Sequence, residues 1–369
     1  MVNIIEKFES VASMKNKHYY NIGDDIEQYP DDWCYIAYSG RNTGKTYSAL
    51  KYMYDNHFNF GFVKRTNEDV DILCKADKGI LNARINLSPW VPIMRDNPGI
   101  RVKTTKVMKG IGAFHLCGPD GDPEGDPIGY VFSLNAISDI KGFNYDADFL
   151  IFDEFIPKPW ERVNRHEGDQ LLDLYKTLDR DRIHRGLPPT KLICLANATQ
   201  INNPVFSILE IIDLVASLDY MPAFNVEDRG IFIRKVNEKG FQEEEKKHPM
   251  YEALKETQWG QMALDGSFAY NDFSLVKDIS LKGAQPYAAL IYKKKNYYIY
   301  HKSGLYYATT SAFNKANVAL YDLDRESERT RYWMDIGFAL RIAVIEGQMY
   351  FKTFTLYDII FNFRKIFNL

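Results

Sequence analysis

The sequence predicts an α/β protein in which a domain with a central parallel-type β-sheet is followed by a helical linker and a small α+β domain. Two apolar segments predict the sheet: one leads into a glycine-containing loop and a helix, and the other ends in two carboxylates. A change in composition after residue 237 predicts the helical linker and the last domain. The expected boundaries are 1–237 for the first domain, 238–271 for the linker and 272–369 for the last domain.

Length and composition fit a folded chain with more than one hydrophobic core. The 369 residues exceed the size at which a single core usually stops growing, and 46% apolar residues argue against extensive disorder. The net charge of −3 is unevenly distributed. Residues 272–369 contain 14 Lys and Arg against 9 Asp and Glu, a net of +5, whereas residues 1–271 contain 32 against 40, a net of −8. The last domain is therefore the basic one.

The cysteines and the apolar segments predict an intracellular protein without a membrane span. Cys34, Cys74, Cys117 and Cys194 are far apart and lack metal-ligand spacing, as expected for reduced thiols. No apolar segment approaches the roughly 20 residues that a membrane-spanning helix needs. The N-terminus also lacks the pattern of a signal peptide.

A phosphate-binding loop is predicted between the first apolar segment, residues 33–38, and a predicted helix, residues 46–54. In such a loop, backbone N–H groups surround a polyphosphate, Lys45 reaches the β- and γ-phosphates, and the Thr46 hydroxyl ligates Mg²⁺. The usual pattern begins with glycine, whereas this one begins with Ser39. The alternative is an ordinary strand-to-helix turn with a solvated lysine. The loop sequence is Ser39-Gly40-Arg41-Asn42-Thr43-Gly44-Lys45-Thr46.

Shorter elements are expected before and after this strand–loop–helix unit. Residues 1–30 are expected to be a lead-in with one helix. A segment rich in Gly, Pro and Asp, residues 118–127, is expected to be a surface loop. The other elements expected before residue 135 are strands at 60–63, 100–104, 113–117 and 130–134 and a weak helix at 67–82.

The second apolar segment, residues 149–152, is expected to be a buried central strand that ends in Asp153 and Glu154. Parallel sheets place ligands at the carboxyl ends of their strands. We therefore expect Asp153 to hold Mg²⁺ through water and Glu154 to polarise an attacking water molecule. Taken alone, such a pair more often marks a strand that ends in acidic turn residues. About a hundred residues after a Gly-Lys-Thr loop, it predicts nucleotide hydrolysis.

A third buried strand, residues 191–196, ends in Asn197. Its amide is well placed to sense the γ-phosphate if this strand lies beside the loop strand, and the alternative is a turn former or helix cap. A helix at 170–182 precedes this strand. A loop and helix at 201–218 and a last strand at 230–236 follow it.

The charge run at residues 243–247 is expected to lie on a solvated helical linker. Beyond it, three segments rich in tyrosine and β-branched residues predict an antiparallel meander with strands at 287–292, 297–302 and 305–309 and turns at 293–296 and 303–304. A mixed helical and apolar tail closes the chain.

Several of these segments together resemble one family, the DNA encapsidation (packaging) ATPases of phi-29-like small tailed phages. The resemblance runs from about residue 33 to about residue 310, and weakly to the end of the chain. The segments that carry it are the loop Ser39 to Thr46, Ile151-Phe152-Asp153-Glu154-Phe155-Ile156, Cys194-Leu195-Ala196-Asn197-Ala198, Asn203-Pro204 and Gly260-Gln261-Met262-Ala263-Leu264-Asp265. Position 39 departs from the family, which has glycine there, and the 118–127 segment is longer than expected.

The resemblance implies a P-loop NTPase domain of the additional-strand (ASCE) type that hydrolyses ATP with Mg²⁺. It also implies a homo-oligomeric ring, usually a pentamer, at the portal of a procapsid in the host cytoplasm, moving double-stranded DNA inward without sequence preference. A structural RNA and the genome terminal protein are further implied partners. The alternatives are a terminase with an active nuclease, a DNA helicase, or an ATP-dependent assembly or adaptor protein that moves nothing.

Residue roles follow from the same resemblance. Arg180 is implied as an arginine finger that enters the neighbouring subunit's site. Arg182 is the alternative residue for this role. The alternative function for Arg180 is an ordinary ion pair with an acidic residue on a helix face. Lys141 is implied as a second contact to the neighbour's nucleotide. Arg41 is implied as a contact or sensor of phosphate.

The last domain resembles a ribonuclease-H-like fold that has lost its nuclease acids. The predicted first strand, residues 287–292, contains no carboxylate, so we expect no nuclease activity. Lys293, Lys294 and Lys295 are then candidate contacts to DNA phosphates, with a solvated turn as the alternative. Lys64 and Arg65 are a second pair of candidates.

Overall fold

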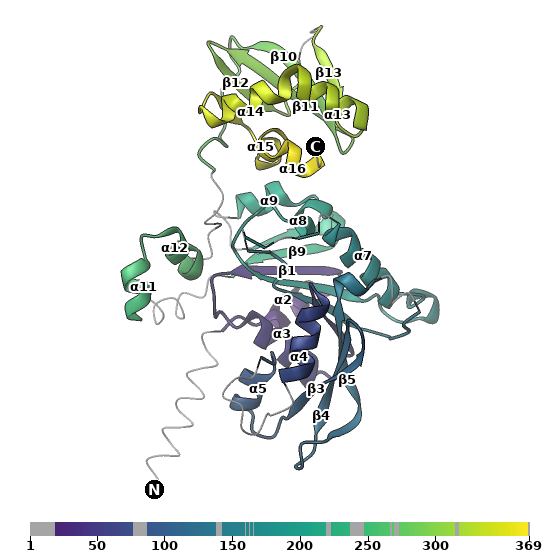
Figure 1. The fold of residues 1–369 in the computed structure, drawn as a ribbon. Helices are drawn as coiled ribbons and strands as arrows, with labels where there is room; N and C mark the ends of the chain where they lie inside the picture. The colour runs from purple at the N-terminus through teal and green to yellow at the C-terminus, as the bar shows by residue number, and fades with distance from the viewer. Residues whose placement is uncertain are drawn as a thin grey trace. The chain divides into compact units, whose positions relative to one another are not determined.

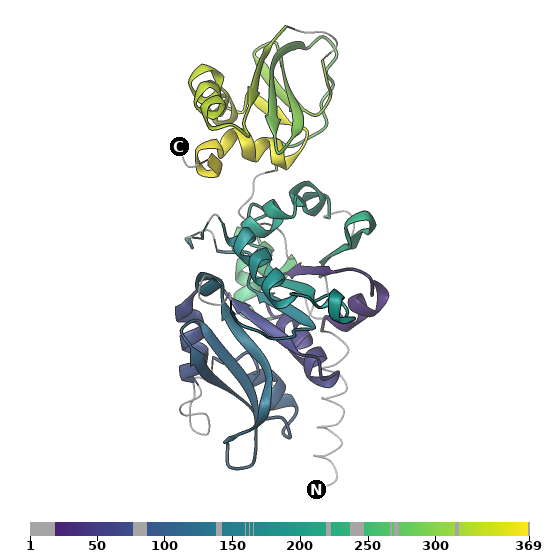
Figure 2. The ribbon, with the colours of Figure 1, turned by 90° about the vertical axis from the view of Figure 1, so that its right-hand side faces the viewer.

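Two compact units make up the protein in a computed structural model. One comprises Met1–Leu209 with Ser217–Tyr270, and the other comprises Glu210–Ala216 with Asn271–Leu369. Each unit is described by itself (Figures 1 and 2). The structure describes residues 19–76, 87–137, 142–158, 160–161, 163–164, 166–218, 223–236, 247–265, 268, 273–313 and 317–367.

The first unit is built on a nine-stranded sheet in the order β3-β4-β5-β2-β6-β7-β1-β9-β8. The six strands from β5 to β9 in this order are parallel to their neighbours, and β3, β4 and β8 pair antiparallel at the two edges. The strands are β1 (Cys34–Ser39), β2 (Phe60–Lys64), β3 (Val102–Met108), β4 (Ile111–Cys117), β5 (Pro123–Ser133), β6 (Phe149–Asp153), β7 (Lys191–Asn197), β8 (Ala223–Val226) and β9 (Ile231–Lys235). The predicted α/β class with a largely parallel central sheet is confirmed.

The central strands are apolar along nearly their whole length because both faces of the sheet are covered. Every residue of β1 is buried, and β6 and β7 are buried except at their ends. Their register decides what lies together: Ser39 pairs with Asn197, and Asp153 pairs with Leu195. Hence β1, β7 and β6 end side by side at one edge of the sheet.

Helices α2, α3, α4 and α5 contribute apolar residues to the core that they share with this sheet. Helix α3 buries Ala49, Leu50 and Met53, and α2 begins where the Asn21 side chain accepts a hydrogen bond from the Gly23 N–H. The helices described are α2 (Ile22–Gln28), α3 (Lys45–Asp55), α4 (Asn67–Ala76), α5 (Val91–Asp96), α7 (Glu167–Leu178), α8 (Pro204–Ile208), α11 (Pro249–Leu254) and α12 (Gln258–Asp265).

The segment 118–127 was expected to be a surface loop, and this prediction is wrong for its second half. Strand β5 already begins at Pro123, and Cys117 and Leu116 of β4 pair with Pro123 and Glu124. Only the turn at 118–122 remains outside the strands. Cross-strand pairing outweighs the low strand propensity of Pro, Gly and Asp here, and Pro123 is tolerated as a first strand residue. Strand β8 was not predicted either.

The second unit contains a five-stranded sheet in the order β13-β10-β11-β12-β14. The predicted meander is confirmed as β10 (Gln285–Tyr292), β11 (Lys295–Lys302) and β12 (Leu305–Thr309); β13 (Ala319–Asp322) and β14 (Met349–Phe351) add parallel edges. The two hairpin turns have positive φ at both central positions, Lys293 and Lys294 in one and Ser303 and Gly304 in the other, as two-residue turns that match strand twist require.

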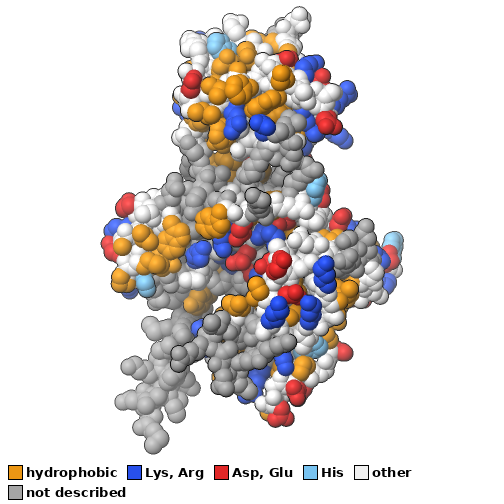
Figure 3. All heavy atoms as spheres, in the orientation of Figure 1, with side chains coloured by type: hydrophobic (Ala, Val, Ile, Leu, Met, Phe, Trp, Pro, Cys, Tyr) orange, Lys and Arg blue, Asp and Glu red, His pale blue; other side chains and the backbone are white. Residues whose placement is uncertain are grey.

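Helices α9 (Ile212–Ser217), α13 (Glu326–Tyr332), α14 (Phe338–Ile345), α15 (Phe354–Phe361) and α16 (Phe363–Phe367) complete the second unit. A separate core forms there around Leu290, Ile299 and Phe351. Hydrophobic side chains also gather on its surface (Figure 3). Met334 and Phe338 are among the exposed hydrophobic residues of this unit, at 77% and 58%. The charge run of the linker, residues 243–247, lies outside the described residues except for Lys247.

Candidate functional site

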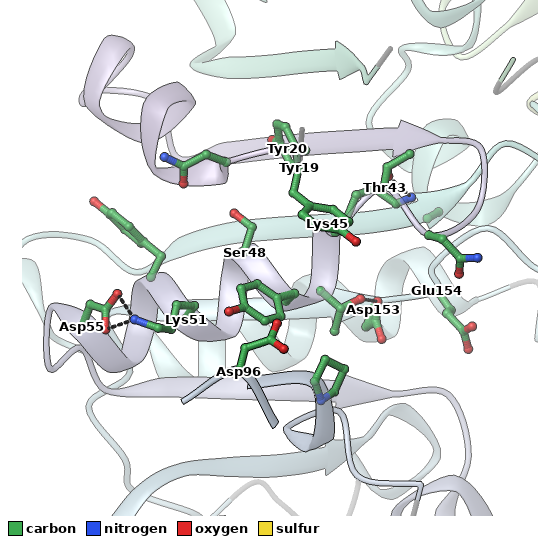
Figure 4. A pocket seen from close by; sticks show the side chains of 18 of the residues that line it. Tyr19, Tyr20, Thr43, Lys45, Ser48, Lys51, Asp55, Asp96, Asp153 and Glu154 are labelled. Carbon is green, nitrogen blue, oxygen red and sulfur yellow. Dashed lines mark hydrogen bonds and ion pairs between the residues drawn. The ribbon is translucent and has the colours of Figure 1, made fainter. Parts of the chain in front are cut away.

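The loop residues and the polar residues predicted at the tips of the central strands gather where β1, β7 and β6 end. The loop between β1 and α3 lies beside the tip of β6, and both contribute to a cavity of about 720 Å³ (Figure 4). Lys45, Thr46, Asp153, Glu154 and Asn197 all line this cavity. The carboxyl edge of a parallel sheet is the usual ligand site of such folds.

The loop needs glycine at position 44. Gly44 has φ of 85°, in the left-handed region, and a Cβ there would lie 2.9 Å from the Tyr19 ring. Gly44 is also the N-cap of α3, which has no side-chain cap. The first N–H groups of α3 are therefore available to an anionic group in the cavity.

Lys45 lies folded back onto its own loop. Its ammonium donates to the Ser39 hydroxyl, to the Gly40 carbonyl at 3.1 Å, to the Thr43 hydroxyl at 3.2 Å and to the Asn197 amide oxygen at 3.4 Å. The side chain is buried, and this burial lowers the pKa of Lys45 to about 8, although the nearby carboxylates of Asp153 and Glu154 act in the opposite direction.

Oxygen donors suited to a divalent cation meet next to Lys45. The Thr46 hydroxyl donates to the Asp153 carboxylate at 2.9 Å, and the second carboxylate oxygen of Asp153 is 3.3 Å from the Lys64 ammonium. A hydroxyl and a carboxylate are the hard ligands that Mg²⁺ accepts, and Mg²⁺ usually keeps several waters besides. Within the described residues, no cluster of three or more His, Cys, Asp or Glu offers an all-protein metal site.

Glu154 is held in an unusual backbone conformation. It is exposed, and its φ is 57°, which is uncommon for a residue with a side chain. The Arg65 guanidinium donates to the carbonyls of Glu154 and Phe155 at 3.2 and 3.1 Å, and the Phe155 N–H donates to the Leu195 carbonyl. These contacts fix the sharp turn after β6 and leave the Glu154 carboxylate facing the cavity edge.

Lys64 and Arg65 form ion pairs within the protein and do not present free charges to DNA. This corrects the prediction that they contact DNA phosphates. Lys64 is paired with Asp153, and Arg65 forms an ion pair of 2.6 Å with Glu167, whose side chain is 1% exposed. Each cation is only 17% exposed. Lys64 ends β2 and Arg65 follows it, and the fold places this end of the strand beside acidic groups, which the sequence alone did not show.

The Arg65–Glu167 pair allows a prediction about stability. Burial raises the pKa of Glu167, and Arg65 opposes this rise. Arg65→Ala should therefore leave a buried carboxylate without its partner and lower the free energy of unfolding by about 3–5 kcal/mol. The surface pair of Arg95 and Asp96 provides the control, because Arg95 is 68% exposed and Arg95→Ala should cost less than about 0.5 kcal/mol. Urea unfolding of both variants checks this, and equal midpoints would contradict it.

Arg180 and Arg182 lie at the other end of β6. Arg182 is 2% exposed; it pairs with Asp148 at 2.8 Å and donates to the Pro188 carbonyl. Asp148 directly precedes β6, whose five residues span roughly 16 Å at about 3.3 Å per residue. Burial excludes Arg182 as a group that enters a neighbour, whereas Arg180, two residues earlier, is exposed. Lys141 lies outside the described residues.

Residues of the lead-in also line the cavity, and the sequence did not predict this. Tyr19 and Tyr20 lie beside the loop (Figure 4), and the Tyr20 N–H donates to the Thr43 carbonyl at 3.2 Å. The Tyr20 hydroxyl donates to Asp25, which also pairs with Arg234 of β9. No local pattern marks these tyrosines, because only the tertiary fold brings the lead-in to the loop.

Arg41 borders a second cavity of about 550 Å³, which Asp153, Glu154 and Asn197 also line. Its backbone N–H donates to the Ala263 carbonyl of α12 at 3.1 Å. Its Nε is buried and has no hydrogen-bond partner among the described residues. The loop arginine is thus anchored by its backbone to α12, while its side chain borders the acidic tips of β6.

Within the described part of the chain, no helix has the length and apolar character to cross a membrane.

Comparison with known proteins gives a consistent set of relatives. The family model described as Podovirus DNA encapsidation protein (Gp16) matches residues 124–335. A DNA packaging protein of Bacillus phage B103 is 30% identical over 175 residues, which cover 46% of this chain and 50% of that protein. The chain thus aligns with about half the length of this curated relative.

Two solved structures share the fold over almost the whole chain. One, described as the bacteriophage Phi-29 viral genome packaging motor assembly, covers 95% of this chain and 100% of its own, with a TM-score of 0.62 and 18% identity. The other, described as the Phi-28 gp11 DNA packaging motor, covers 95% and 98%, with a TM-score of 0.60 and 18% identity. At this level of identity, the two matches establish the fold alone.

Proposed function

Because the chain belongs to the Podovirus DNA encapsidation protein (Gp16) family, whose model matches more than half of it, we propose that it is an ATPase that packages viral DNA. We propose further that it is a subunit of a ring, usually of five copies, that moves double-stranded DNA through the portal of a procapsid. The observation that carries this proposal is the meeting of Lys45, Thr46, Asp153 and Asn197 at the carboxyl edge of one parallel sheet.

Each of these residues has a role in binding ATP. The backbone of residues 39–46 surrounds the phosphates as a P-loop, and Lys45 contacts the β- and γ-phosphates. Thr46 and Asp153 hold Mg²⁺, which neutralises charge on the phosphate oxygens when bound. The hydrogen bond between Thr46 and Asp153, at 2.9 Å, supports their acting on one ion.

The residues around the γ-phosphate act in hydrolysis. Glu154 orients and polarises the attacking water, and its fixed backbone supports this because a positioned base needs little reorganisation. Asn197 senses the γ-phosphate through the amide that now accepts from Lys45. Arg41 contributes a phosphate-sensing cation from the second cavity.

The ring arrangement explains the position of Arg180. Arg182 is tied to Asp148 at the end of β6 opposite to Glu154, so Arg180 is better placed for a neighbouring subunit's nucleotide than for its own. An arginine finger supplied in this way stabilises charge in the transition state.

The last domain is proposed to bind or dock without cutting DNA. Strand β10 contains no carboxylate, which supports a ribonuclease-H-like fold without nuclease function. Lys293, Lys294 and Lys295 at the β10–β11 turn are proposed to contact DNA phosphates, and Lys295 would have to exchange its ion pair with Glu210, at 2.7 Å, for this contact. A structural RNA and the genome terminal protein remain proposed partners, and the portal vertex in the host cytoplasm remains the proposed location.

One experiment tests the function as a whole. ATP hydrolysis is measured with and without double-stranded DNA, alongside the mass of the assembly and a nicking assay in Mg²⁺ or Mn²⁺. A DNA packaging motor predicts ring-sized assemblies, stimulation by DNA and no nicking. Nicking would favour a terminase with an active nuclease, and slow hydrolysis without stimulation would favour an assembly or adaptor protein.

Lys45→Ala is expected to weaken nucleotide binding by about 10–100-fold, because the charge-assisted hydrogen bonds to phosphate are lost. Titration with a fluorescent ATP analogue measures the change. Lys255→Ala, at the C-cap of α11, is the matched control, since this lysine is 53% exposed and forms a surface ion pair with Glu252. Equal affinities of the two variants would argue against the proposed phosphate site.

A further inference from the structure

Ser39, where the family pattern has glycine, contributes a hydroxyl to the interior of the loop. Its side chain is fully buried, and its hydroxyl lies 2.7 Å from both the Gly40 carbonyl and the Thr43 hydroxyl. The Lys45 ammonium donates to this same hydroxyl. A glycine at position 39 would offer Lys45 no such acceptor.

The hydrogen-bonding capacity of Lys45 is already used within the protein. An ammonium has three N–H donors. Four acceptors surround it: the Ser39 hydroxyl, the Gly40 carbonyl, the Thr43 hydroxyl and the Asn197 amide oxygen. No donor is left over for a phosphate oxygen, so Lys45 has to give up protein acceptors before it can bind a polyphosphate.

We propose that the Ser39 hydroxyl is a positioning group that competes with phosphate for Lys45 and thereby weakens the binding of polyphosphates to this loop. This inference rests on the proposed function, because it requires that Lys45 contacts the β- and γ-phosphates. Ser39 acts on the state without nucleotide: its hydroxyl stabilises the folded-back lysine, and that stabilisation is lost when the lysine turns to the ligand.

Of the four acceptors, the Ser39 hydroxyl is the one that Lys45 is expected to exchange for a phosphate oxygen. Gly40 offers a backbone carbonyl that stays in the loop whatever its side chains do, and Asn197 is the most distant of the four acceptors. Once Lys45 leaves, the Ser39 hydroxyl keeps Thr43 and the Gly40 carbonyl as partners, so it is not left unsatisfied. Phosphate binding therefore replaces the Ser39 hydroxyl by a phosphate oxygen as an acceptor for Lys45 and leaves no buried polar group without a hydrogen bond.

The test compares nucleotide affinities of Ser39→Ala with those of the unchanged full-length protein. Ser39→Ala is expected to bind ADP and a non-hydrolysable ATP analogue about three- to tenfold more tightly, since one hydrogen bond to a charged group no longer opposes binding. AMP lacks the phosphates that meet Lys45, so its affinity is expected to stay the same. In turnover, KM for ATP should fall, because the hydroxyl no longer stabilises the state without nucleotide.

A second variant separates the hydroxyl from packing. Ser39→Cys keeps a side chain of similar shape but only a weak acceptor, so it should behave like Ser39→Ala. Thermal unfolding verifies that both variants fold. Affinity for ADP that is unchanged or weaker in both variants would overturn the inference, and so would an equal gain for AMP. Failure of the unchanged protein to bind ATP would instead refute the proposed function.

Discussion

Arg180→Ala is expected to lower ATP turnover by about 10³–10⁵-fold while nucleotide binding stays nearly unchanged. This is the size of the effect that arginine fingers have in other NTPases, where the guanidinium neutralises charge that develops only in the transition state. Steady-state hydrolysis by assembled rings measures the loss. Lys176→Ala is the matched control on the preceding helix turn, because this lysine is 73% exposed and should change turnover less than about twofold.

Mixing experiments decide whether Arg180 acts on its neighbour. Subunits carrying Arg180→Ala still have Glu154, and subunits carrying Glu154→Gln still have Arg180. If the arginine acts between subunits, some interfaces in a mixed ring contain both groups and regain activity. Mixed rings that remain as inactive as either variant alone would remove support for this assignment. Turnover of Arg180→Ala equal to that of the control would favour a protein that binds ATP without a motor cycle.

Glu154→Gln is expected to retain ATP binding and to lower hydrolysis by about 10²–10⁴-fold, the usual contribution of a general base. The amide keeps the shape of the side chain and the backbone contacts from Arg65, so the turn after β6 should be preserved. Trapped ATP in a single-turnover assay is the expected readout.

Glu161→Gln controls for the loss of one negative charge near Glu154. Glu161 lines the second cavity together with Glu154, its side chain is 35% exposed, and its carboxylate lies 3.6 Å from the Arg65 guanidinium. Its hydrolysis rate should stay close to that of the unchanged protein. If Glu154→Gln hydrolysed ATP equally well, another group would have to activate the water, and the proposed role of Glu154 would be lost.

Much of the fold could be predicted because it is encoded by short-range patterns. The apolar run 33–38 predicts β1, the run 149–152 predicts β6, and three tyrosine-rich segments separated by turns predict the meander of the last domain. Burial on both faces demands continuous apolar strands, and this demand is visible in single segments. The 118–127 segment could not be predicted in this way, because pairing with β4 decides its structure.

The amino-acid sequence specifies which groups are available: a Gly-Lys-Thr loop after a buried strand, two carboxylates after another, and an asparagine after a third. Their neighbours in space depend on how the strands are ordered in the sheet. The strand order places β7 between β1 and β6, which brings Asn197 to Lys45 and Asp153 to Thr46. It also buries Arg182 and pairs Lys64 and Arg65 with acids. Local patterns record which face of a segment is buried, but which strand pairs with which depends on contacts between residues far apart in the chain.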